Sequence, residues 1–234
     1  MRFYSPTFSC YLLLFVLASQ HSRAAIHDSV EADFFGEAEL ILTASRMSKP
    51  LLESPASVTV IDRETIEASG ARELADLFRL VPGFVVGSVN GNDPLVTYQG
   101  LGRPFGRQLQ VLIDGRSVFI PSFGGVPWAQ LPLLIEDIER IEVIRGPNAA
   151  TYGANAFLAT VNIITRHSAE DYGSRFSVAA SGPSDRNIKD AYLRFGNHFD
   201  NLDWRLSLGA VNDDGLNDSH DSKQAAKINF RLDL

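Results

Sequence analysis

Cysteine is almost absent from this sequence, since Cys10 is the only one among its 234 residues. It lies in a predicted N-terminal targeting segment, so the mature chain is expected to contain no thiol. Disulfides, cysteine metal sites and cysteine nucleophiles are therefore excluded for the mature protein. An exported chain without cysteine suits a protein of the bacterial envelope.

The chain also lacks an excess of positive charge and an apolar run long enough to form a membrane-spanning helix. Its formal net charge is -7, whereas nucleic-acid-binding proteins show basic stripes, so we expect no nucleic-acid partner. The apolar run Tyr11–Ala18 is too short to cross a bilayer as a helix. With Arg2 before it and Ser22-Arg23-Ala24 after it, the run predicts a signal peptide cleaved after Ala24.

Residues 50–166 have the pattern of a compact α+β domain, with a small mixed sheet and short helices. Asp62 is predicted to cap a helix that extends through Ser69. A second helix is predicted over Ala71–Val81, because its apolar residues at i, i+3, i+4 and i+7 form one stripe that packs in the core. The predicted strands are Val58–Ile61, Leu95–Gln99, Gln108–Ile113 and Arg140–Ile144.

After about residue 166, apolar and polar residues alternate, as in β-strands with two different faces. A soluble antiparallel sheet with one wet face gives this signal, and so does a transmembrane barrel with apolar residues toward lipid. The connections favour the barrel, because outer-membrane barrels alternate long external loops with short periplasmic turns. Here Gly182–Lys189 is long, Asn197–Asn201 is short and Val211–Lys223 is long. The apolar faces are Phe176, Val178 and Ala180; Ala191, Leu193 and Phe195; Leu202, Trp204, Leu206, Leu208 and Ala210; and Ala226, Ile228, Phe230 and Leu232.

Several segments in the middle of the chain form an ordered set of motifs. They are Leu77–Phe84, Val111–Gly115, Ile135–Pro147, Ala150–Ala156 and Val161–Thr165. This set resembles the plug domain of TonB-dependent outer-membrane receptors, which take up ferric siderophores, cobalamin, haem and some glycans. The resemblance implies an α+β plug domain followed by antiparallel transmembrane β-barrel strands. The chain departs from the family pattern at Gln99, where an arginine is common, and at Leu158-Ala159, which replaces a Gly-Gly pair.

The resemblance implies that the chain has successive parts with different roles. A signal peptide covers residues 1–24, an extension with a TonB box covers 25–49, a plug domain covers 50–166 and the first barrel strands cover 167–234. Receptors of this kind close about 22 strands around the plug. About four strands cannot close a membrane barrel, because their edges would face hydrocarbon unpaired. We therefore expect a fragment or a truncated gene product with an incomplete barrel.

A short apolar, β-prone segment near the N-terminus corresponds by this resemblance to the TonB box. Its residues are Glu39, Leu40, Ile41, Leu42, Thr43, Ala44 and Ser45. The segment is expected to leave the barrel when ligand binds outside, and then to add a strand to the periplasmic protein TonB. The alternative is an ordinary frayed N-terminus.

The resemblance also assigns Arg140, Glu142 and Arg145 to charge pairing between plug and barrel, with barrel glutamates as partners of the arginines. Burying such charges unpaired would be costly. The alternative is that Arg140 and Glu142 form surface pairs that contribute little to stability.

Ligand contacts are expected from the loops between strands, which contain Gly, Pro, Asn and aromatic residues. Aromatic side chains suit planar or apolar parts of a ligand, and Arg103 suits an anionic chelate. For each residue, packing of its loop against the barrel wall is the alternative. The candidates are Asn90, Asn92, Arg103, Phe105, Phe119, Phe123 and Trp128.

The sequence contains no recognisable catalytic set, metal-ligand spacing or Gly-rich phosphate loop, so we expect no enzyme, no resident metal and no cofactor. The acidic segment Asp213–Asp218 does not match the EF-hand pattern and is expected to be a solvated loop, with calcium binding as the alternative.

The predicted function is TonB-dependent uptake of a ferric siderophore, another metal chelate or a cobalamin-like ligand across the outer membrane of a Gram-negative bacterium. TonB with its inner-membrane complex, the ligand and outer-membrane lipid are the expected partners. One alternative is a truncated, plug-like periplasmic protein that binds TonB or ligand without transport. Another is an exported enzyme with an unrecognised catalytic set.

Overall fold

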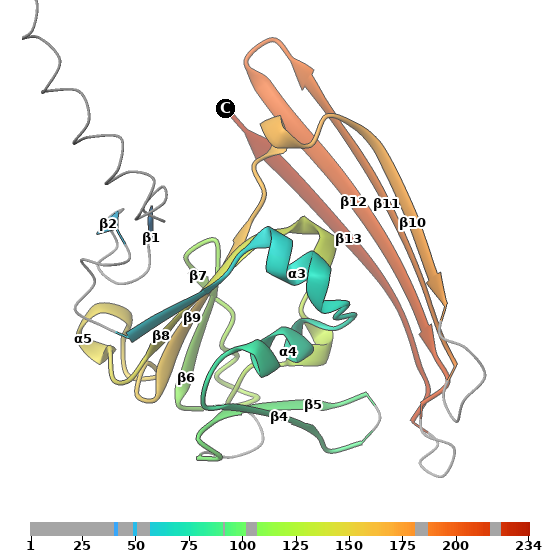
Figure 1. Cartoon of the computed structure of the whole chain (residues 1–234). Helices are drawn as coiled ribbons and strands as arrows, with labels where there is room; N and C mark the ends of the chain where they lie inside the picture. The colour runs from blue at the N-terminus through green and yellow to red at the C-terminus, as the bar shows by residue number, and fades with distance from the viewer. Residues whose placement is uncertain are drawn as a thin grey trace, which may run out of the picture.

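The computed structural model describes residues 40–41, 49–50, 57–90, 92–101, 107–180, 187–215 and 221–234. The predicted signal peptide lies outside the described residues, as does most of the predicted TonB box. Of that box only Leu40–Ile41 is described, as strand β1, which pairs antiparallel with β2 (Lys49–Pro50). The other described residues form an inner domain, within residues 57–165, and a curved sheet that stands beside it, called here the wall (Figure 1).

The inner domain contains a five-stranded mixed sheet in the order β3-β8-β9-β6-β7. Strands β6 and β9 are parallel, and the other pairs are antiparallel. A separate antiparallel hairpin consists of β4 and β5. This architecture confirms the predicted α+β domain with a small mixed sheet. The strands are β3 (Ser57–Ile61), β4 (Phe84–Ser88), β5 (Pro94–Tyr98), β6 (Leu109–Ile113), β7 (Arg116–Ser117), β8 (Ile138–Arg145) and β9 (Ala159–Thr165).

The first predicted helix is present as α3 (Arg63–Ser69). The Thr65 backbone N–H donates to Asp62 Oδ1 at 2.7 Å, which confirms the predicted N-cap. Hydrogen bonding with the Thr65 side chain, together with this backbone hydrogen bond, holds the pKa of the Asp62 carboxyl below its usual value. The helix ends at Gly70, whose φ of 64° lies in the left-handed region that glycine adopts without strain.

The second predicted helix is shorter than the sequence pattern indicates. It consists of α4 (Leu74–Leu77) and the 3-10 turn η2 (Phe78–Leu80), so the predicted start at Ala71 is wrong. Glu73 at the N-cap makes no side-chain hydrogen bond to the helix, so the first turn lacks the stabilisation that Asp62 gives to α3. No helix in the described part of the chain is both long and apolar enough to cross a membrane. The remaining short helical elements are η3 (Trp128–Gln130), η4 (Ile135–Asp137), α5 (Ala149–Tyr152) and η5 (Ser168–Glu170).

The apolar core lies between the helices and one face of the five-stranded sheet. The predicted helical stripe is confirmed, because all of its members are buried in this core. The rings of Phe78 and Trp128 meet edge to face, with centroids 5.1 Å apart. Trp128 therefore belongs to the core rather than to an exposed loop. The stripe consists of Leu74, Leu77, Phe78 and Val81.

The wall is an antiparallel meander in the order β10-β11-β12-β13. The connection between β11 and β12 is a short turn, whereas those from β10 to β11 and from β12 to β13 are longer. Helices α3 and α4 lie between the five-stranded sheet and the wall (Figure 1). The wall strands are β10 (Gly173–Ala180), β11 (Ile188–Phe199), β12 (Leu202–Asp213) and β13 (Lys223–Asp233).

The polar face of the wall is buried against the inner domain and its apolar face is exposed, which is the reverse of a soluble sheet. Arg205 and Ser207, on the face toward the inner domain, are 1% and 0% exposed. Phe176 and Ile228, on the outer face, are each 69% exposed. A soluble sheet would turn its apolar face to the core, whereas a transmembrane barrel has polar residues inside and apolar residues outside. The wall has the barrel arrangement.

Candidate functional site

A buried contact with the wall centres on Asp171, in the linker between β9 and β10. Its carboxylate is fully buried and lies 2.5 Å from Arg194 Nη1 and 2.8 Å from Arg205 Nη1. Arg166 Nη1, from the linker itself, lies 3.0 Å away. Arg194 and Arg205 belong to β11 and β12, so one linker carboxylate holds both wall strands.

Asp137, at the end of η4, extends this contact. Its Oδ1 accepts hydrogen bonds from Ser207 Oγ at 2.7 Å and Tyr192 Oη at 3.1 Å, both from the wall. Arg205 Nε lies 3.8 Å from the same oxygen. Buried charges are costly unless they are paired, so these contacts fix the inner domain against the wall. We call Asp137, Arg166, Asp171, Arg194 and Arg205 the Asp171 cluster.

Two glycines on the inner face of the wall permit close approach of the inner domain. A Cβ atom added to Gly196 would collide with the backbone carbonyl of Asp171, and one added to Gly209 would collide with the Leu134 side chain. A larger residue at Gly196 would push the linker away from the wall, because it meets backbone atoms, whereas a larger residue at Gly209 would displace the end of the Leu134 side chain.

A looser contact surrounds a cavity of about 1150 Å³ between the inner domain and the wall, called here the chamber. Arg72 is paired with Asp190 of β11, and Glu73 lies 3.4 Å from Lys223 of β13. Both pairs cross from the connection between α3 and α4 to the wall. Glu136 also lines the chamber, and burial raises the pKa of its carboxyl.

A third contact joins β13 to the turn between β6 and β7. Arg231 Nη1 donates to Thr165 Oγ1 at 2.5 Å and lies 3.5 Å from Asp114 Oδ2. Asp114 in turn accepts from the Thr165 backbone N–H at 2.8 Å and from its hydroxyl at 2.7 Å. Each of the strands β11, β12 and β13 therefore carries an arginine that contacts the inner domain or the linker that follows it.

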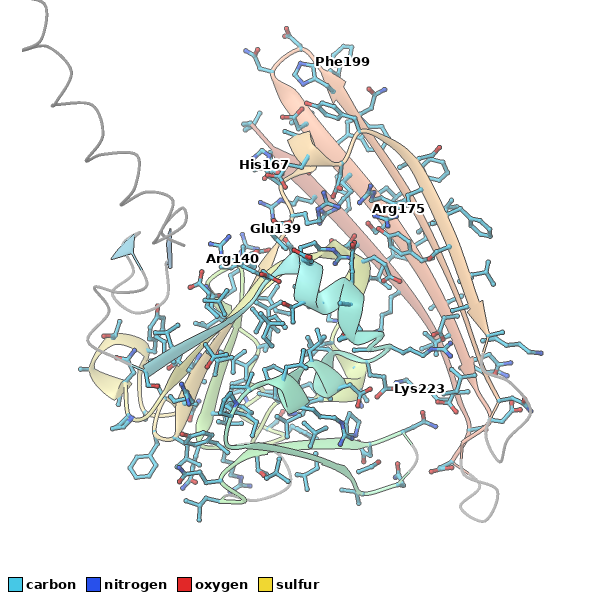
Figure 2. The ribbon with its side chains drawn as sticks, viewed as in Figure 1. Glu139, Arg140, His167, Arg175, Phe199 and Lys223 are labelled. Atoms are coloured by element: carbon cyan, nitrogen blue, oxygen red, sulfur yellow. The ribbon has the colours of Figure 1, made fainter. Side chains whose placement is uncertain are left out.

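The residues predicted for charge pairing between plug and barrel all lie on β8. Two of them, Arg140 and Glu142, pair with each other. Arg140 Nε donates to Glu142 Oε1 at 2.9 Å, and the Glu142 side chain is fully buried. Arg145 lies at the end of the same strand. Figure 2 shows Arg140 beside Glu139 near the start of β8.

The carboxylates that pair with the buried wall arginines Arg194 and Arg205 are Asp137 and Asp171, which sequence reasoning missed. Two signals were available: Asp137 lies within the plug-like motif Ile135–Pro147, and Arg194 and Arg205 lie at polar positions of the strand alternation. Asp171 had no comparable signal, because it lies within the linker and its partners Arg194 and Arg205 come from strands distant in the sequence.

The candidate ligand residues divide into exposed and buried ones. Asn90 and Asn92 lie at the tip of the β4–β5 hairpin, and Asn92 Nδ2 donates to the backbone carbonyl of Asp221 just before β13. Phe123 is 39% exposed, and Phe119 is partly exposed. Arg103 and Phe105 lie outside the described residues, and Trp128 packs in the core, as described above. Within the described ranges, no group of three or more His, Cys, Asp or Glu side chains is arranged to hold a metal.

Residues 50–160 match the family model of the TonB-dependent receptor plug domain. The chain belongs to the TonB-dependent receptors through its plug domain. The inner domain is thus the plug. The Asp171 cluster lies where the plug, the linker and the wall meet, and the chamber lies between the plug and the wall.

Curated relatives support the same assignment. The vitamin B12 transporter BtuB of Vibrio vulnificus (strain CMCP6) is 34% identical over 157 residues, which are 66% of this chain and 25% of the relative. An iron-regulated outer membrane virulence protein of Vibrio cholerae serotype O1 (strain ATCC 39541) is 32% identical over 146 residues, 60% of this chain and 22% of the relative. The chain spans about a quarter of the length of these relatives.

Solved structures show the fold likeness. The ferric citrate transporter FecA in its unliganded form has a TM-score of 0.65 and 20% sequence identity to this chain. The matched region is 78% of this chain and 29% of FecA. The alcaligin outer membrane receptor FauA from Bordetella pertussis has a TM-score of 0.57 and 21% identity, and covers 75% of this chain, which covers 30% of FauA. Since the residues before β10 make up less than 78% of the chain, the likeness to FecA includes part of the wall.

Proposed function

We propose that this chain is the N-terminal part of an outer-membrane receptor that imports a scarce nutrient with energy from TonB. The observation that carries the proposal is the reversed burial of the wall. Its outer face exposes apolar side chains such as Phe176, Ile228 and Phe230, and its inner face buries Arg194 and Arg205 against the plug. This distribution suits strands with lipid outside and a plugged polar lumen inside.

The lengths of the connections support an orientation for the receptor. Outer-membrane barrels have long loops outside the cell and short turns in the periplasm. The short turn after Phe199 would then be periplasmic, and the end of the wall that carries Lys223 would face outward. Figure 2 shows these two residues at opposite ends of the wall. Asn92 contacts Asp221 at the outward end, which suits a role of the β4–β5 hairpin in ligand recognition.

The ligand class we propose is a ferric siderophore or a cobalamin-like compound. Relatives are named for vitamin B12 transport, and solved structures of the same fold are named for ferric citrate and ferric enterobactin. The loops supply residues for such ligands: exposed aromatic rings such as Phe123 suit planar parts, and Arg103 suits anionic groups. The proposed contacts are Asn90, Asn92, Arg103, Phe105, Phe119 and Phe123, while the core position of Trp128 supports packing instead.

The coupling step we propose is strand addition between the TonB box, Glu39–Ser45, and TonB. Backbone hydrogen bonds give such pairing its strength, so the segment needs little side-chain specificity. The short strand β1 supports the proposal, since Leu40 and Ile41 of this segment have an extended backbone.

Deletion of Glu39–Ser45 in the receptor tests this function. We expect ligand binding at the cell surface to remain and uptake to stop, because binding uses the loops whereas transport needs force from TonB. Deletion of His27–Asp33, a segment of equal length in the same extension, is the matched control and should leave uptake intact. Undiminished uptake after the first deletion would refute the coupling role.

Growth rescue tests the ligand class. Cells that depend on this receptor are supplied with ferric enterobactin, ferric citrate or vitamin B12 as the only source of iron or cobalamin. Growth on one of these compounds, which is lost when the receptor gene is removed, supports the proposal. Growth on none of them would refute the proposed ligand class.

A further inference from the structure

The chamber contains an acidic side chain that has no direct cationic partner. Arg72 pairs with Asp190 of β11, and Glu73 lies 3.4 Å from Lys223 of β13. Glu136 lines the same cavity, and among the residues that the structure describes no basic group lies within ion-pairing distance of its carboxylate. Burial raises the pKa of the Glu136 carboxyl, so a cationic group placed beside it would stabilise its ionised form.

Lys227 of β13 supplies the opposite charge to the chamber. Its Nζ donates to the backbone carbonyl of Leu133 at 3.0 Å, and within the described ranges no carboxylate lies at ion-pairing distance from it. A lysine ammonium group has three N–H donors, so two stay available to a ligand. Glu136 is close enough for its charge to act on Lys227. The chamber thus presents an anionic and a cationic group that lie near each other without direct contact.

Two buried polar atoms of residues that line the chamber have no hydrogen-bond partner in the described part of the chain. Both contacts of Arg72 with Asp190 go to Oδ2, and Oδ1 of the same carboxylate has none. Trp128 is 6% exposed, and its indole Nε1 also lacks a partner. Because buried polar groups are nearly always hydrogen-bonded, these atoms indicate a further partner with both a donor and an acceptor.

The size and lining of the chamber suit a small molecule. Its volume is about 1150 Å³, and apolar side chains such as Leu74, Leu133 and Leu134 form part of its lining. Small-molecule sites combine apolar surfaces with a few polar groups that fix the orientation of the ligand. A ligand with a short carbon chain and two polar ends fits this distribution.

We propose that the chamber binds a small zwitterion in which a short carbon chain separates a primary ammonium group from a carboxylate. Glu136 and Asp190 Oδ1 accept hydrogen bonds from the ammonium group, and Lys227 donates to the carboxylate. Such a ligand brings no net charge into a cavity in which uncompensated buried charge is costly. The site goes beyond the proposed uptake function, because its charged groups are not among the loop residues proposed to contact the imported compound.

Calorimetry on the purified receptor tests the proposed site. The probes are glycine, γ-aminobutyrate and ε-aminocaproate, which carry the two charged groups at increasing separation, together with butylamine and butyrate, which carry one each. We expect at least one zwitterion to bind with a Kd of about 1 mM or tighter. It should bind at least about tenfold more tightly than butylamine or butyrate, because only the zwitterion satisfies both charges. Absence of binding by all three zwitterions, or equally tight binding of a probe with one charge, would overturn the proposal.

Two substitutions distinguish the two ends of the site. Glu136→Gln and Lys227→Met each remove one charge and should weaken binding of the zwitterion at least about tenfold. Ligand-observed NMR, which detects weak binding, should show that Glu136→Gln weakens butylamine more than butyrate and that Lys227→Met does the reverse. A merely structural role of either residue would weaken both probes alike, and that result would overturn the assignment.

Glu64→Gln and Lys189→Met are the matched controls, because both residues are exposed and neither lines the chamber. They should leave the affinity for the zwitterion unchanged. Unchanged affinity in Glu136→Gln and Lys227→Met as well would place the ligand elsewhere and refute the chamber site. If either variant fails to fold, the comparison of zwitterions with butylamine and butyrate on the parent receptor still decides. The measurement needs no transport, so its outcome is independent of the proposed uptake function.

Discussion

At Asp171, three guanidinium groups surround a single fully buried carboxylate, and charge neutrality requires further acids nearby. Asp137 supplies one, and Glu139 supplies another through its contact with Arg166 at 3.4 Å. The three arginines thus face three carboxylates. Such a balanced set is stable only when all members are present, so each residue depends on the correct placement of both the plug and the wall.

The Asp171 cluster also shows why the sequence did not predict the role of Asp171. Asp171 is one of many scattered acidic residues, and in the sequence it looks like any solvated surface carboxylate. Its role depends on Arg194 and Arg205, which are distant in sequence and reach it only because β11 and β12 turn their polar face inward. Asp62, by contrast, was predicted correctly, because an N-cap depends only on the residues that directly follow it.

Substitution of Gly196 by alanine tests the tight fit of the linker against the wall. The added Cβ would overlap the Asp171 carbonyl, so the linker must shift and weaken the Asp171 cluster. Overpacking of this kind costs about 1–3 kcal/mol. We expect a lower unfolding temperature of the purified receptor and earlier tryptic cleavage of the plug on heating.

Gly87→Ala is the matched control, because nothing lies within 4 Å of a Cβ atom at that position. It should leave the unfolding temperature close to that of the parent. If Gly196→Ala is as stable as the control, the linker does not need this close approach.

At the scale of secondary structure, the sequence predicted most strands but could not decide which face of the wall lies inside. Alternation has a period of two in both soluble sheets and membrane barrels, so the pattern alone is ambiguous. The plug resolves the ambiguity, since it packs against the polar face. Strand β4 was missed because Gly87 weakens its strand pattern. Strand β9 was missed because a continuous buried run has no period that identifies it.

Substitution of Ile228 by lysine tests the lipid-facing role of β13. Ile228 lies near the middle of this strand and is 69% exposed on the outer face. A lysine near the bilayer midplane of a barrel costs about 2–4 kcal/mol. We therefore expect less receptor in the outer membrane, measured as the folded fraction that migrates differently in gels before and after heating.

Asn229→Lys is the control, because Asn229 lies next in the strand and faces the opposite side. A lysine there faces the polar lumen and should leave assembly unchanged. Equal assembly of Ile228→Lys and the parent receptor would show that this face does not contact lipid.

At the scale of the whole molecule, the plug is joined to the wall by a short linker and held by contacts that differ between the two ends of the strands. The linker from Thr165 to Gly173 itself contains Asp171, so the covalent connection and the buried ion cluster coincide. Force applied at the N-terminus therefore acts on a plug that is fixed at its C-terminal end. This arrangement favours rotation or partial separation of the plug over its complete release from the lumen.

Removal of the plug tests whether it fills a continuous channel. Deletion of residues 50–166 in the receptor should leave an outer-membrane barrel with an open lumen, because barrels of about 22 strands have interiors wide enough to require a plug. Cells should then become sensitive to large antibiotics such as vancomycin, measured as a lower inhibitory concentration. The control removes residues 1–24 as well, so that the protein is not exported and sensitivity stays at the parental level. Unchanged resistance with the shortened protein present in the outer membrane would show that the wall strands do not enclose a channel that the plug blocks.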